Sequence, residues 1–135
     1  VFVLAPQLGP DRWNALLMGA IAMFGHVFSV FASFKGGKGV ATACGVVLAL
    51  APLPATVTLA LWASLVWLTG YVSVASIVAC SMFPVVAWIA NPSDRYAIVS
   101  GMALASFVVF NHRANIGRLR AGAEARIRPY KSEAS

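Results

Sequence analysis

The sequence predicts an all-α membrane protein, a polytopic helical bundle, from two observations. First, 60% of the 135 residues are hydrophobic and only 10% are charged, whereas soluble domains carry about 25% charged residues. Second, no Asp, Glu, Lys or Arg occurs between Lys38 and Asp94. One bilayer crossing takes about 20 residues, so this uncharged run must contain several helices joined by short turns.

The basic residues indicate a membrane surface as the partner and not a nucleic acid. The net charge is +6, but Lys and Arg lie at the ends of the apolar segments, as they do beside membrane helices. Cys44 and Cys80 lie inside apolar segments, so we interpret them as small buried hydrophobic residues and not as a disulfide or a metal pair. The sequence contains no metal-binding cluster and no cofactor motif, and we expect no cofactor.

Turn residues divide the chain into its expected helices. Residues 1–8 are apolar and begin without Met, and we interpret them as the end of a helix whose start is missing. Clusters of Gly, Pro, Asn and Asp then mark turns. They separate the apolar segments 13–31, 40–51, 55–69, 72–90 and 97–110. We expect about five transmembrane helices after this truncated stub, in one domain over 1–128, with a polar C-terminal tail over 129–135.

Lys and Arg also predict the orientation. Cytoplasmic loops are enriched in these residues, which gather in the loop 34–39 and in the C-terminal segment. If both face the cytoplasm, an even number of crossings must separate them. Splitting 40–69 into two helices at its prolines satisfies this requirement, although such helices reach only about 18–23 Å of the roughly 30 Å hydrocarbon core. The 70–76 turn then lies at the same membrane face as the loop 34–39 and the segment from His112 to Asn115.

The loop 34–39 reads Phe-Lys-Gly-Gly-Lys-Gly and has the composition of an anion site. Consecutive glycines let backbone amides approach a ligand, and the helix N-terminus that follows favours anions. Lys35 and Lys38 add positive charge. The pattern predicts a phosphate or carboxylate site, and the alternative is a basic loop whose glycines only form turns. The amides would come from Gly36, Gly37 and Gly39.

Two histidines and an asparagine are candidates for a site. His26 lies in an apolar segment one or two turns from the loop, where a polar side chain usually faces protein or a cavity, in either a structural or a supporting role. His112 and Asn115 share a helix face if their segment is helical, and Arg118 follows one turn later. A basic helix end bound to anionic lipid explains the arginines better than it explains His112 and Asn115.

The remaining polar candidates are two serines and a carboxylate. Ser73 and Ser76 lie in or just after the 70–76 turn, as packing residues or as hydrogen-bond donors to phosphate. Glu124 is one of only four carboxylates in the chain. With so few carboxylates, a paired-carboxylate or His–Asp acid–base mechanism is hard to build.

Two of these segments resemble motifs of a known family. Residues 25–42, which read GHVFSVFASFKGGKGVAT, are similar to the second motif of the bacterial membrane-integral glycerol-3-phosphate acyltransferases that use acyl phosphate. Residues 112–119, HRANIGRL, followed by Gly122 and Glu124, resemble their third motif. The resemblance covers roughly 1–128 and implies seven membrane helices in the full-length protein. The family's first motif, a loop rich in Ser and Gly or Asn with an Arg, would precede residue 1.

The resemblance implies a reaction and a set of roles. The reaction moves an acyl group from acyl phosphate to the 1-hydroxyl of glycerol 3-phosphate, giving lysophosphatidic acid and phosphate in phospholipid biosynthesis, at the cytoplasmic face of the bacterial inner membrane. An activated mixed anhydride needs positioning and charge neutralisation more than an enzyme nucleophile. The catalytic residues would be His112, Asn115 and Lys38. The phosphate-binding residues would be Lys35, Gly36, Gly37, Lys38, Gly39, Ser73 and Ser76. The supporting residues would be His26, Arg118 and Glu124.

Two other functions fit the same composition. A transporter of an anionic metabolite would also use a basic loop and polar intramembrane residues, but the chain has no inverted repeat and its polar residues gather at one face. A lipid-binding structural subunit would use its arginines on anionic headgroups, which leaves the Gly-Gly-Lys-Gly run unexplained. Phosphate release from acyl phosphate would identify the enzyme, and vesicle uptake would identify the carrier. The sequence makes no prediction of the oligomeric state.

Overall fold

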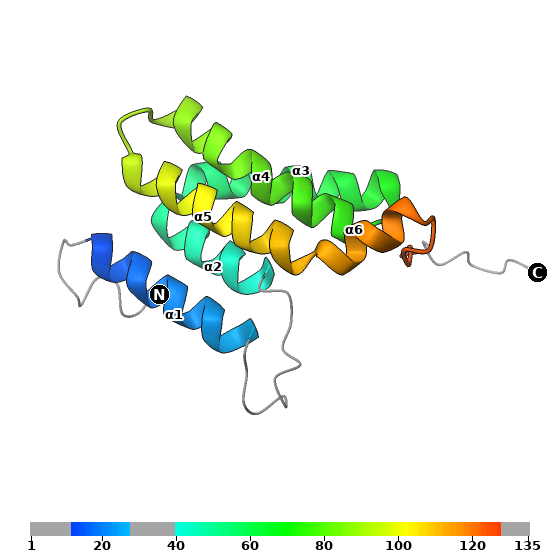
Figure 1. Ribbon diagram of the computed structural model, residues 1–135. Helices are drawn as coiled ribbons and strands as arrows, with labels where there is room; N and C mark the ends of the chain where they lie inside the picture. The colour runs from blue at the N-terminus through cyan, green and yellow to red at the C-terminus, as the bar shows by residue number, and fades with distance from the viewer. Residues whose placement is uncertain (1–11, 28–39, 128–135) are drawn as a thin grey trace, which may run out of the picture.

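The computed structural model describes residues 12–27 and 40–127, which form helices and connecting segments without a strand. Figure 1 shows the arrangement. The helices are α1 (Arg12–Val27), α2 (Val40–Leu50), α3 (Pro52–Thr69), α4 (Val72–Ala90), α5 (Arg95–Asn111) and α6 (Arg113–Arg120). The all-α prediction is therefore confirmed for the described residues.

The helix boundaries follow the predicted turns with two differences. The predicted break within 40–69 is confirmed, but α3 begins at Pro52 and includes Pro54, because proline fits the first turn of a helix, where its missing N–H has no partner to lose. Helix α5 begins earlier than expected, because Asp94 Oδ1 accepts a hydrogen bond from the Ala97 N–H at 3.1 Å and caps the helix. Helix α4 spans 72–90, as predicted.

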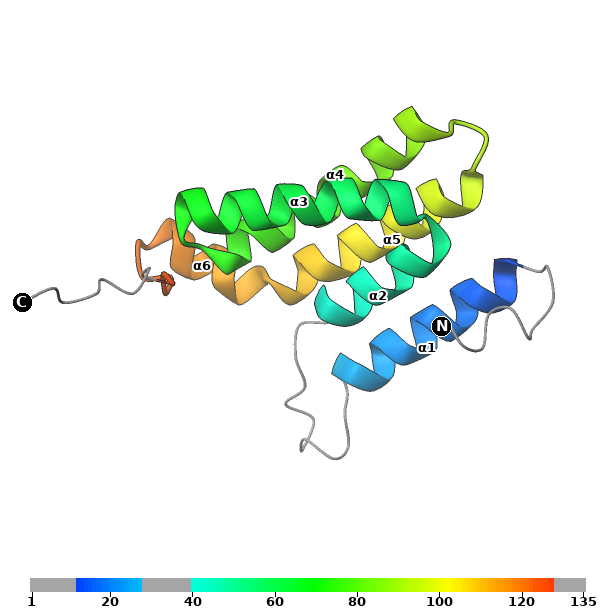
Figure 2. The same ribbon diagram turned by 180° about the vertical axis from the view of Figure 1, so that it is seen from behind.

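The helices pack through small side chains. Helix α4 packs between α3 and α5, while α2 contacts α3 and α5 and carries α1 on its outer side (Figures 1 and 2). One buried cluster, formed by α3, α4, α5 and the break before α3, consists mainly of alanines around Phe83. Small residues let membrane helices approach closely, since lipid provides no hydrophobic force between them. Large apolar side chains such as Trp88 and Ile89 instead lie exposed on the outside, as expected of a surface that faces lipid.

Helix length limits which elements can cross a membrane. Among the described helices, α3 and α4 are long and apolar enough to span, and α5 and α6 together form a third candidate that bends by 56°. Helix α2 has 11 residues and reaches only about 16 Å at 1.5 Å per residue. The expectation of about five crossings remains a prediction.

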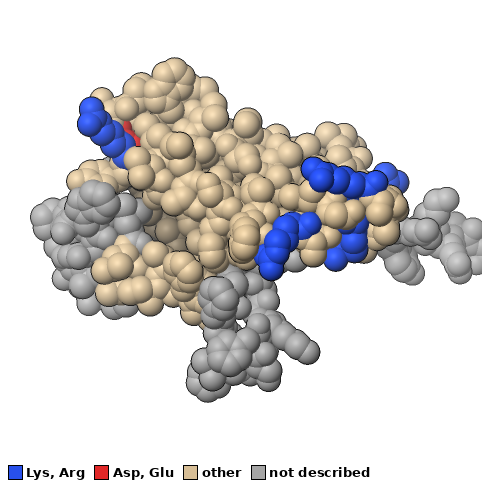
Figure 3. All heavy atoms as spheres, viewed as in Figure 1, with Lys and Arg blue, Asp and Glu red and all other residues tan. Residues whose placement is uncertain are grey.

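The two ends of the bundle differ in charge. Figure 3 shows Lys and Arg atoms at both ends of the body, with a broad uncharged band between them. One end carries Asp94 and Arg95, at the turn between α4 and α5. The other end carries four arginines, in α6 and the segment that follows it. They are Arg113, Arg118, Arg120 and Arg126.

The turn between α3 and α4 lies at this arginine-rich end. Gly70 has φ +71°, the left-handed conformation that ends α3, and its N–H donates to the Val66 carbonyl. The segment after α6 returns to this turn, where the Ile127 N–H donates to the Gly70 carbonyl at 2.8 Å and the Arg126 guanidinium lies 4.6 Å from the centre of the Tyr71 ring. The 70–76 turn and the segment from His112 to Asn115 therefore lie at the same end of the bundle, as predicted. The loop 34–39, the third element of that prediction, lies outside the described residues.

Candidate active site

A cavity of about 820 Å³ opens at the arginine-rich end of the bundle. We call it the polar cavity because six polar side chains lie in its wall. Helices α2, α3, α4 and α6 line it, together with the α5–α6 bend and the segment after α6. Six of the residues predicted from the sequence lie in its wall. They are Ser73, Ser76, His112, Asn115, Arg118 and Glu124.

His112 lies at the bend between α5 and α6 and is only 2% exposed. Its Nδ1 atom lies 2.8 Å from the Val108 carbonyl oxygen. Because a carbonyl oxygen can only accept, Nδ1 carries the hydrogen and donates it. In the neutral ring, Nε2 is then the nitrogen with the lone pair. The Val108 carbonyl thereby fixes both the tautomer and the orientation of the imidazole.

Asn115 and Arg118 are held by the same carboxylate. The Asn115 Nδ2 donates to Glu124 Oε1, and the Arg118 Nε donates to Glu124 Oε2 at 2.7 Å. Gly122, with φ +67°, turns the chain after α6, and the Ala123 N–H bonds back to the Arg118 carbonyl at 2.8 Å. This turn brings Glu124 back toward the helix that carries its two partners.

The pKa of Glu124 shows how strongly its ionised form is held. The hydrogen bond from Asn115 is the largest cause that lowers this pKa, from 4.5 to about 2, with smaller contributions from Ser73 and Arg118. The Ser73 hydroxyl is near enough to favour the carboxylate but makes no hydrogen bond of normal geometry. The site therefore contains a fixed negative charge that neutralises Arg118 and orients Asn115.

Two buried oxygen atoms of the site have no hydrogen-bond partner among the described residues. They are Ser73 Oγ and Asn115 Oδ1, on residues that are 5% and 4% exposed. Buried polar atoms are nearly always paired, because an unpaired one costs about 1–3 kcal/mol. Unpaired atoms in the wall of a polar cavity are the atoms that a bound ligand would satisfy.

Several predicted site residues cannot be placed in this cavity. Lys35, Gly36, Gly37, Lys38 and Gly39 lie outside the described residues, as does the side chain of His26, whose backbone belongs to α1. However, α2 begins directly after Gly39, and its residues Val40 and Ala41 line the cavity. The glycine-rich loop therefore joins the bundle at the cavity wall.

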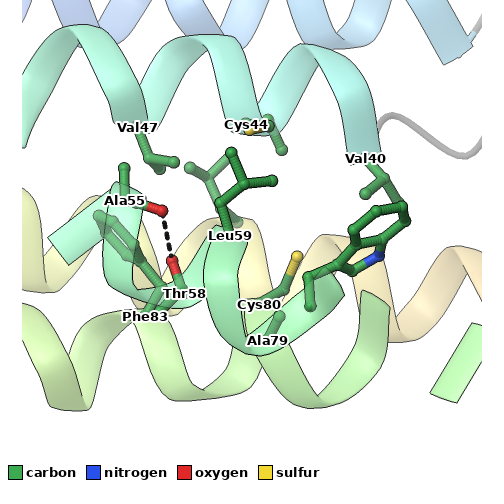
Figure 4. A pocket seen from close by; sticks show the side chains of 13 residues that line it. Val40, Cys44, Val47, Ala55, Thr58, Leu59, Ala79, Cys80 and Phe83 are labelled. Atoms are coloured by element: carbon green, nitrogen blue, oxygen red, sulfur yellow. Dashed lines mark hydrogen bonds between the residues drawn. The ribbon is translucent and has the colours of Figure 1, made fainter. Parts of the chain in front are cut away.

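A narrow apolar cavity adjoins the polar one (Figure 4). Its volume of about 60 Å³ leaves room for roughly five water-sized groups. Val40, Cys44, Leu59 and Trp62 line both cavities. Cys44 and Cys80 face this space from α2 and α4 (Figure 4). They are free thiols and do not form a disulfide.

Sequence reasoning missed Trp62, whose Nε1–H donates to Ser76 Oγ at 3.1 Å. An isolated tryptophan within an apolar segment gives no sequence signal for such a contact. In the described part of the chain, no three His, Cys, Asp or Glu residues lie close enough together to hold a metal ion.

Comparisons with known proteins identify the family of this chain. A protein-family model described as "Glycerol-3-phosphate acyltransferase" matches residues 1–122. Curated proteins named glycerol-3-phosphate acyltransferase are similar over most of the chain. The relative from Chlorobium phaeobacteroides is 37% identical and is matched over 91% of this chain and 62% of its own length. The relative from Trichlorobacter lovleyi is 41% identical, over 93% of this chain and 64% of its own length.

Two solved structures have the same fold. They are crystal structures of PlsY (YgiH), described as an integral membrane glycerol 3-phosphate acyltransferase, in a glycerol 3-phosphate form and a lysophosphatidic acid form. Each superposes with a TM-score of 0.84 at 33% identity and covers 94% of this chain. The chain spans 63% and 64% of those two proteins, and under two thirds of the curated relatives above. By its matched residues, its relatives and its fold, this chain belongs to the glycerol-3-phosphate acyltransferase family of integral membrane proteins.

Proposed function

We propose that the polar cavity is the site at which an acyl group passes from acyl phosphate to the 1-hydroxyl of glycerol 3-phosphate. The observation that carries the proposal is the pair of buried, unpartnered oxygens, Ser73 Oγ and Asn115 Oδ1, beside the oriented imidazole of His112. Glycerol 3-phosphate offers what these groups need. Its hydroxyl hydrogens can satisfy Asn115 Oδ1, and its phosphate oxygens can accept from serine hydroxyls.

The proposed reaction exchanges one bond at the acyl carbonyl carbon for another. In the reaction, the 1-hydroxyl oxygen of glycerol 3-phosphate forms a bond to the acyl carbonyl carbon, and the bond from that carbon to the phosphate oxygen breaks. The hydroxyl proton leaves for phosphate or solvent, and no electrons are transferred to or from a cofactor. The His112 ring, whose Nδ1 donates to the Val108 carbonyl, would orient the attacking hydroxyl. Positioning of this kind supplies most of the rate gain with an activated anhydride.

Phosphate binding falls to two groups of residues. Ser73 and Ser76 lie at the start of α4, where helix N–H groups favour an anion. Lys38 and the glycines directly before α2 would supply positive charge and amides, as expected from the sequence. Two sets of donors suit a reaction in which both substrates carry phosphate.

The adjoining apolar cavity suits the acyl chain. Its lining of Ala, Val, Leu, Phe and Cys residues can take only the first few carbons near the carbonyl, because its volume is about 60 Å³. The rest of a long chain would lie among lipid tails along the exposed faces of the helices. A long-chain acyl phosphate, whose chain is itself anchored in the membrane, fits this arrangement.

The orientation of the site follows from charge. The end with the cavity carries Arg113, Arg118, Arg120 and Arg126, while the opposite end carries Arg95 beside Asp94. The positive-inside rule therefore directs the cavity to the cytoplasm of a bacterial inner membrane, where glycerol 3-phosphate is available.

An acyl-transfer assay tests the proposal. The protein that carries this chain, reconstituted in lipid, should release phosphate from palmitoyl phosphate only when glycerol 3-phosphate is added, and should form lysophosphatidic acid in equal amount. Palmitoyl coenzyme A and an acyl carrier protein, offered in its place, test the choice of donor. Lys38→Ala should reduce turnover by at least about tenfold, since a charge-assisted hydrogen bond is lost. A folded wild-type protein that releases no phosphate in response to the acceptor would contradict the proposal, and uptake of glycerol 3-phosphate into vesicles would identify a carrier instead.

A further inference from the structure

Trp62 occupies a position that no other described residue shares. It lines the polar cavity, the apolar cavity and a third hollow beside Arg126 at the end of α3. Its ring nitrogen donates across to α4, where Ser76 Oγ accepts at 3.1 Å. Ser76 is only 1% exposed, so this contact lies inside the bundle, at the boundary between the two cavities of the site.

The hydrogen bond from Trp62 changes what the Ser76 hydroxyl can do. Most hydroxyls on α3 and α5 give their hydrogen to a backbone carbonyl of their own helix. They belong to Thr56, Thr58, Ser64, Thr69, Ser100 and Ser106. Ser76 makes no such bond within the described residues, and its oxygen already accepts from Trp62. Its hydrogen therefore remains to be donated, and the surface it lines is the polar cavity.

We propose that Trp62 is a positioning residue of the acyl-transfer site. Its Nε1–H fixes the Ser76 hydroxyl so that the hydrogen points to a phosphoryl oxygen, and its ring separates the polar from the apolar cavity. This inference rests on the function proposed above. It adds that the phosphate position and the entry of the acyl chain are set by the same side chain, and that Trp62 itself does not react.

A purely structural role for Trp62 does not account for its surroundings. The other tryptophans with described side chains, Trp67 and Trp88, are 86% and 57% exposed near helix ends, where tryptophan commonly marks the membrane interface. Trp62 instead lies about 12 Å along α3 from the turn at Gly70, at 1.5 Å per residue, and so is not at that helix end. It also lies outside both buried clusters that hold the helices together. Its ring N–H donates to Ser76, a residue of the site.

The two parts of the role can be separated by two substitutions. Trp62→Phe keeps an aromatic wall but removes the N–H, so the KM for glycerol 3-phosphate or the donor should rise about three- to tenfold while the preference for donor chain length is unchanged. Ser76→Ala should have a similar effect, and the double variant should be no worse than Ser76→Ala alone, since both changes remove one interaction. Trp62→Ala also removes the wall and should shift the chain-length preference of the acyl phosphate. Trp88→Phe, at the far end of α4, is the matched control.

Fluorescence provides a readout that does not depend on turnover. The chain has four tryptophans, and replacing Trp13, Trp67 and Trp88 with Phe, together with any tryptophan outside residues 1–135, leaves Trp62 as the reporter. Glycerol 3-phosphate should change its emission in a saturable way, and Ser76→Ala in the same background should abolish or weaken that change about tenfold. This measurement also applies if Trp62→Ala does not fold.

The outcomes distinguish this inference from the proposed function. Additive effects of Trp62→Phe and Ser76→Ala, or kinetics of Trp62→Phe equal to those of Trp88→Phe, would overturn the role of Trp62 while leaving acyl transfer intact. Absence of acyl transfer by the folded wild type would overturn the proposed function, and the fluorescence titration would then show whether Trp62 still reports a phosphate site.

Discussion

The two ends of this bundle handle their polar groups in opposite ways. At the α4–α5 turn, two polar side chains bond the backbone beside them: Asp94 caps α5 through the Ala97 N–H, and Asn91 Oδ1 accepts from the Ser93 N–H. At the α6 end, Ser73 Oγ and Asn115 Oδ1 are buried without a partner. At one end, polar side chains serve to terminate helices. At the other end, buried polar atoms are left unpaired, and we propose that a ligand satisfies them. Four experiments test that contrast, in order of their expected effect.

The largest effect is expected from asparagine at the two ends. Asn115→Ala removes an oriented amide from the cavity and should lower kcat/KM by about 100-fold or more, the usual cost of losing one preorganised polar group in an active site. Asn91→Ala, in the exposed opposite turn, should leave kcat/KM within about twofold. Steady-state phosphate release from the two purified variants provides the comparison. Equal losses in both, with both folded, would show that the two ends do not differ in the way described.

The next effect concerns the packing of α4 against α5, away from the wall of the polar cavity. A Cβ added at Gly101 would lie 2.6 Å from Phe83 Cδ1, so Gly101→Ala must displace an aromatic side chain and should destabilise the protein by about 1–3 kcal/mol. At Gly45, in α2, an added Cβ meets nothing within 4 Å, and Gly45→Ala should be neutral or slightly stabilising. Thermal unfolding in detergent measures both. A Gly101→Ala protein as stable as wild type would show that α4 and α5 are not packed this closely.

The third prediction concerns the carboxylate that holds Asn115 and Arg118. The pKa of Glu124 is lowered to about 2, so the stability it contributes is complete above about pH 4.5 and is lost as the pH falls toward 2. The amides of residues 113–127 should therefore remain protected from hydrogen exchange at pH 4.5 and lose protection near pH 2. Protection here means the exchange rate relative to that of an unfolded chain at the same pH. Glu124→Gln should remove this pH dependence and lower kcat/KM about tenfold, because Arg118 loses its charged partner. Exchange that accelerates equally in the variant over this range would assign the transition to another group.

The smallest effect is expected from the cap at the other end. Asp94→Ala removes the side-chain acceptor for the Ala97 N–H and should reduce stability by about 1 kcal/mol, without changing KM for either substrate. Ser93→Ala, next to it in the exposed turn, is the matched control. Thermal unfolding and steady-state kinetics on the same preparations check both statements. A raised KM in Asp94→Ala would mean that this end also communicates with the substrates.

The fold was largely predictable because its turns are marked by residues that disfavour helix. Gly70 and Asn91 flank α4, and its predicted bounds agree with the structure. The break between α2 and α3 was predicted from charge parity and not from length, and Pro52 is the residue that makes it physically necessary. The 56° bend at His112 carried no such signal, because neither Gly nor Pro lies there.

The site was predictable as a set of residues but not as a set of contacts. His112 and Asn115 stood out because a basic helix end bound to anionic lipid explains them poorly, whereas Ser76 had a packing role as its alternative. The pairing of Asn115 with Glu124 depends on the reversal of the chain at Gly122, and no local pattern encodes that distance. The contact between Trp62 and Ser76 joins two helices, so it follows from their packing and not from either sequence segment.

Equilibrium binding tests most directly whether the polar cavity is the phosphate site. Calorimetric titration of glycerol 3-phosphate into the wild type, Ser76→Ala and Ser106→Ala compares a serine in the cavity wall with an exposed serine that bonds its own helix. We expect the wild type and Ser106→Ala to bind with the same Kd, and Ser76→Ala to bind about tenfold more weakly, the cost of a hydrogen bond to a charged group. The same Kd in all three proteins would contradict the assignment of the cavity.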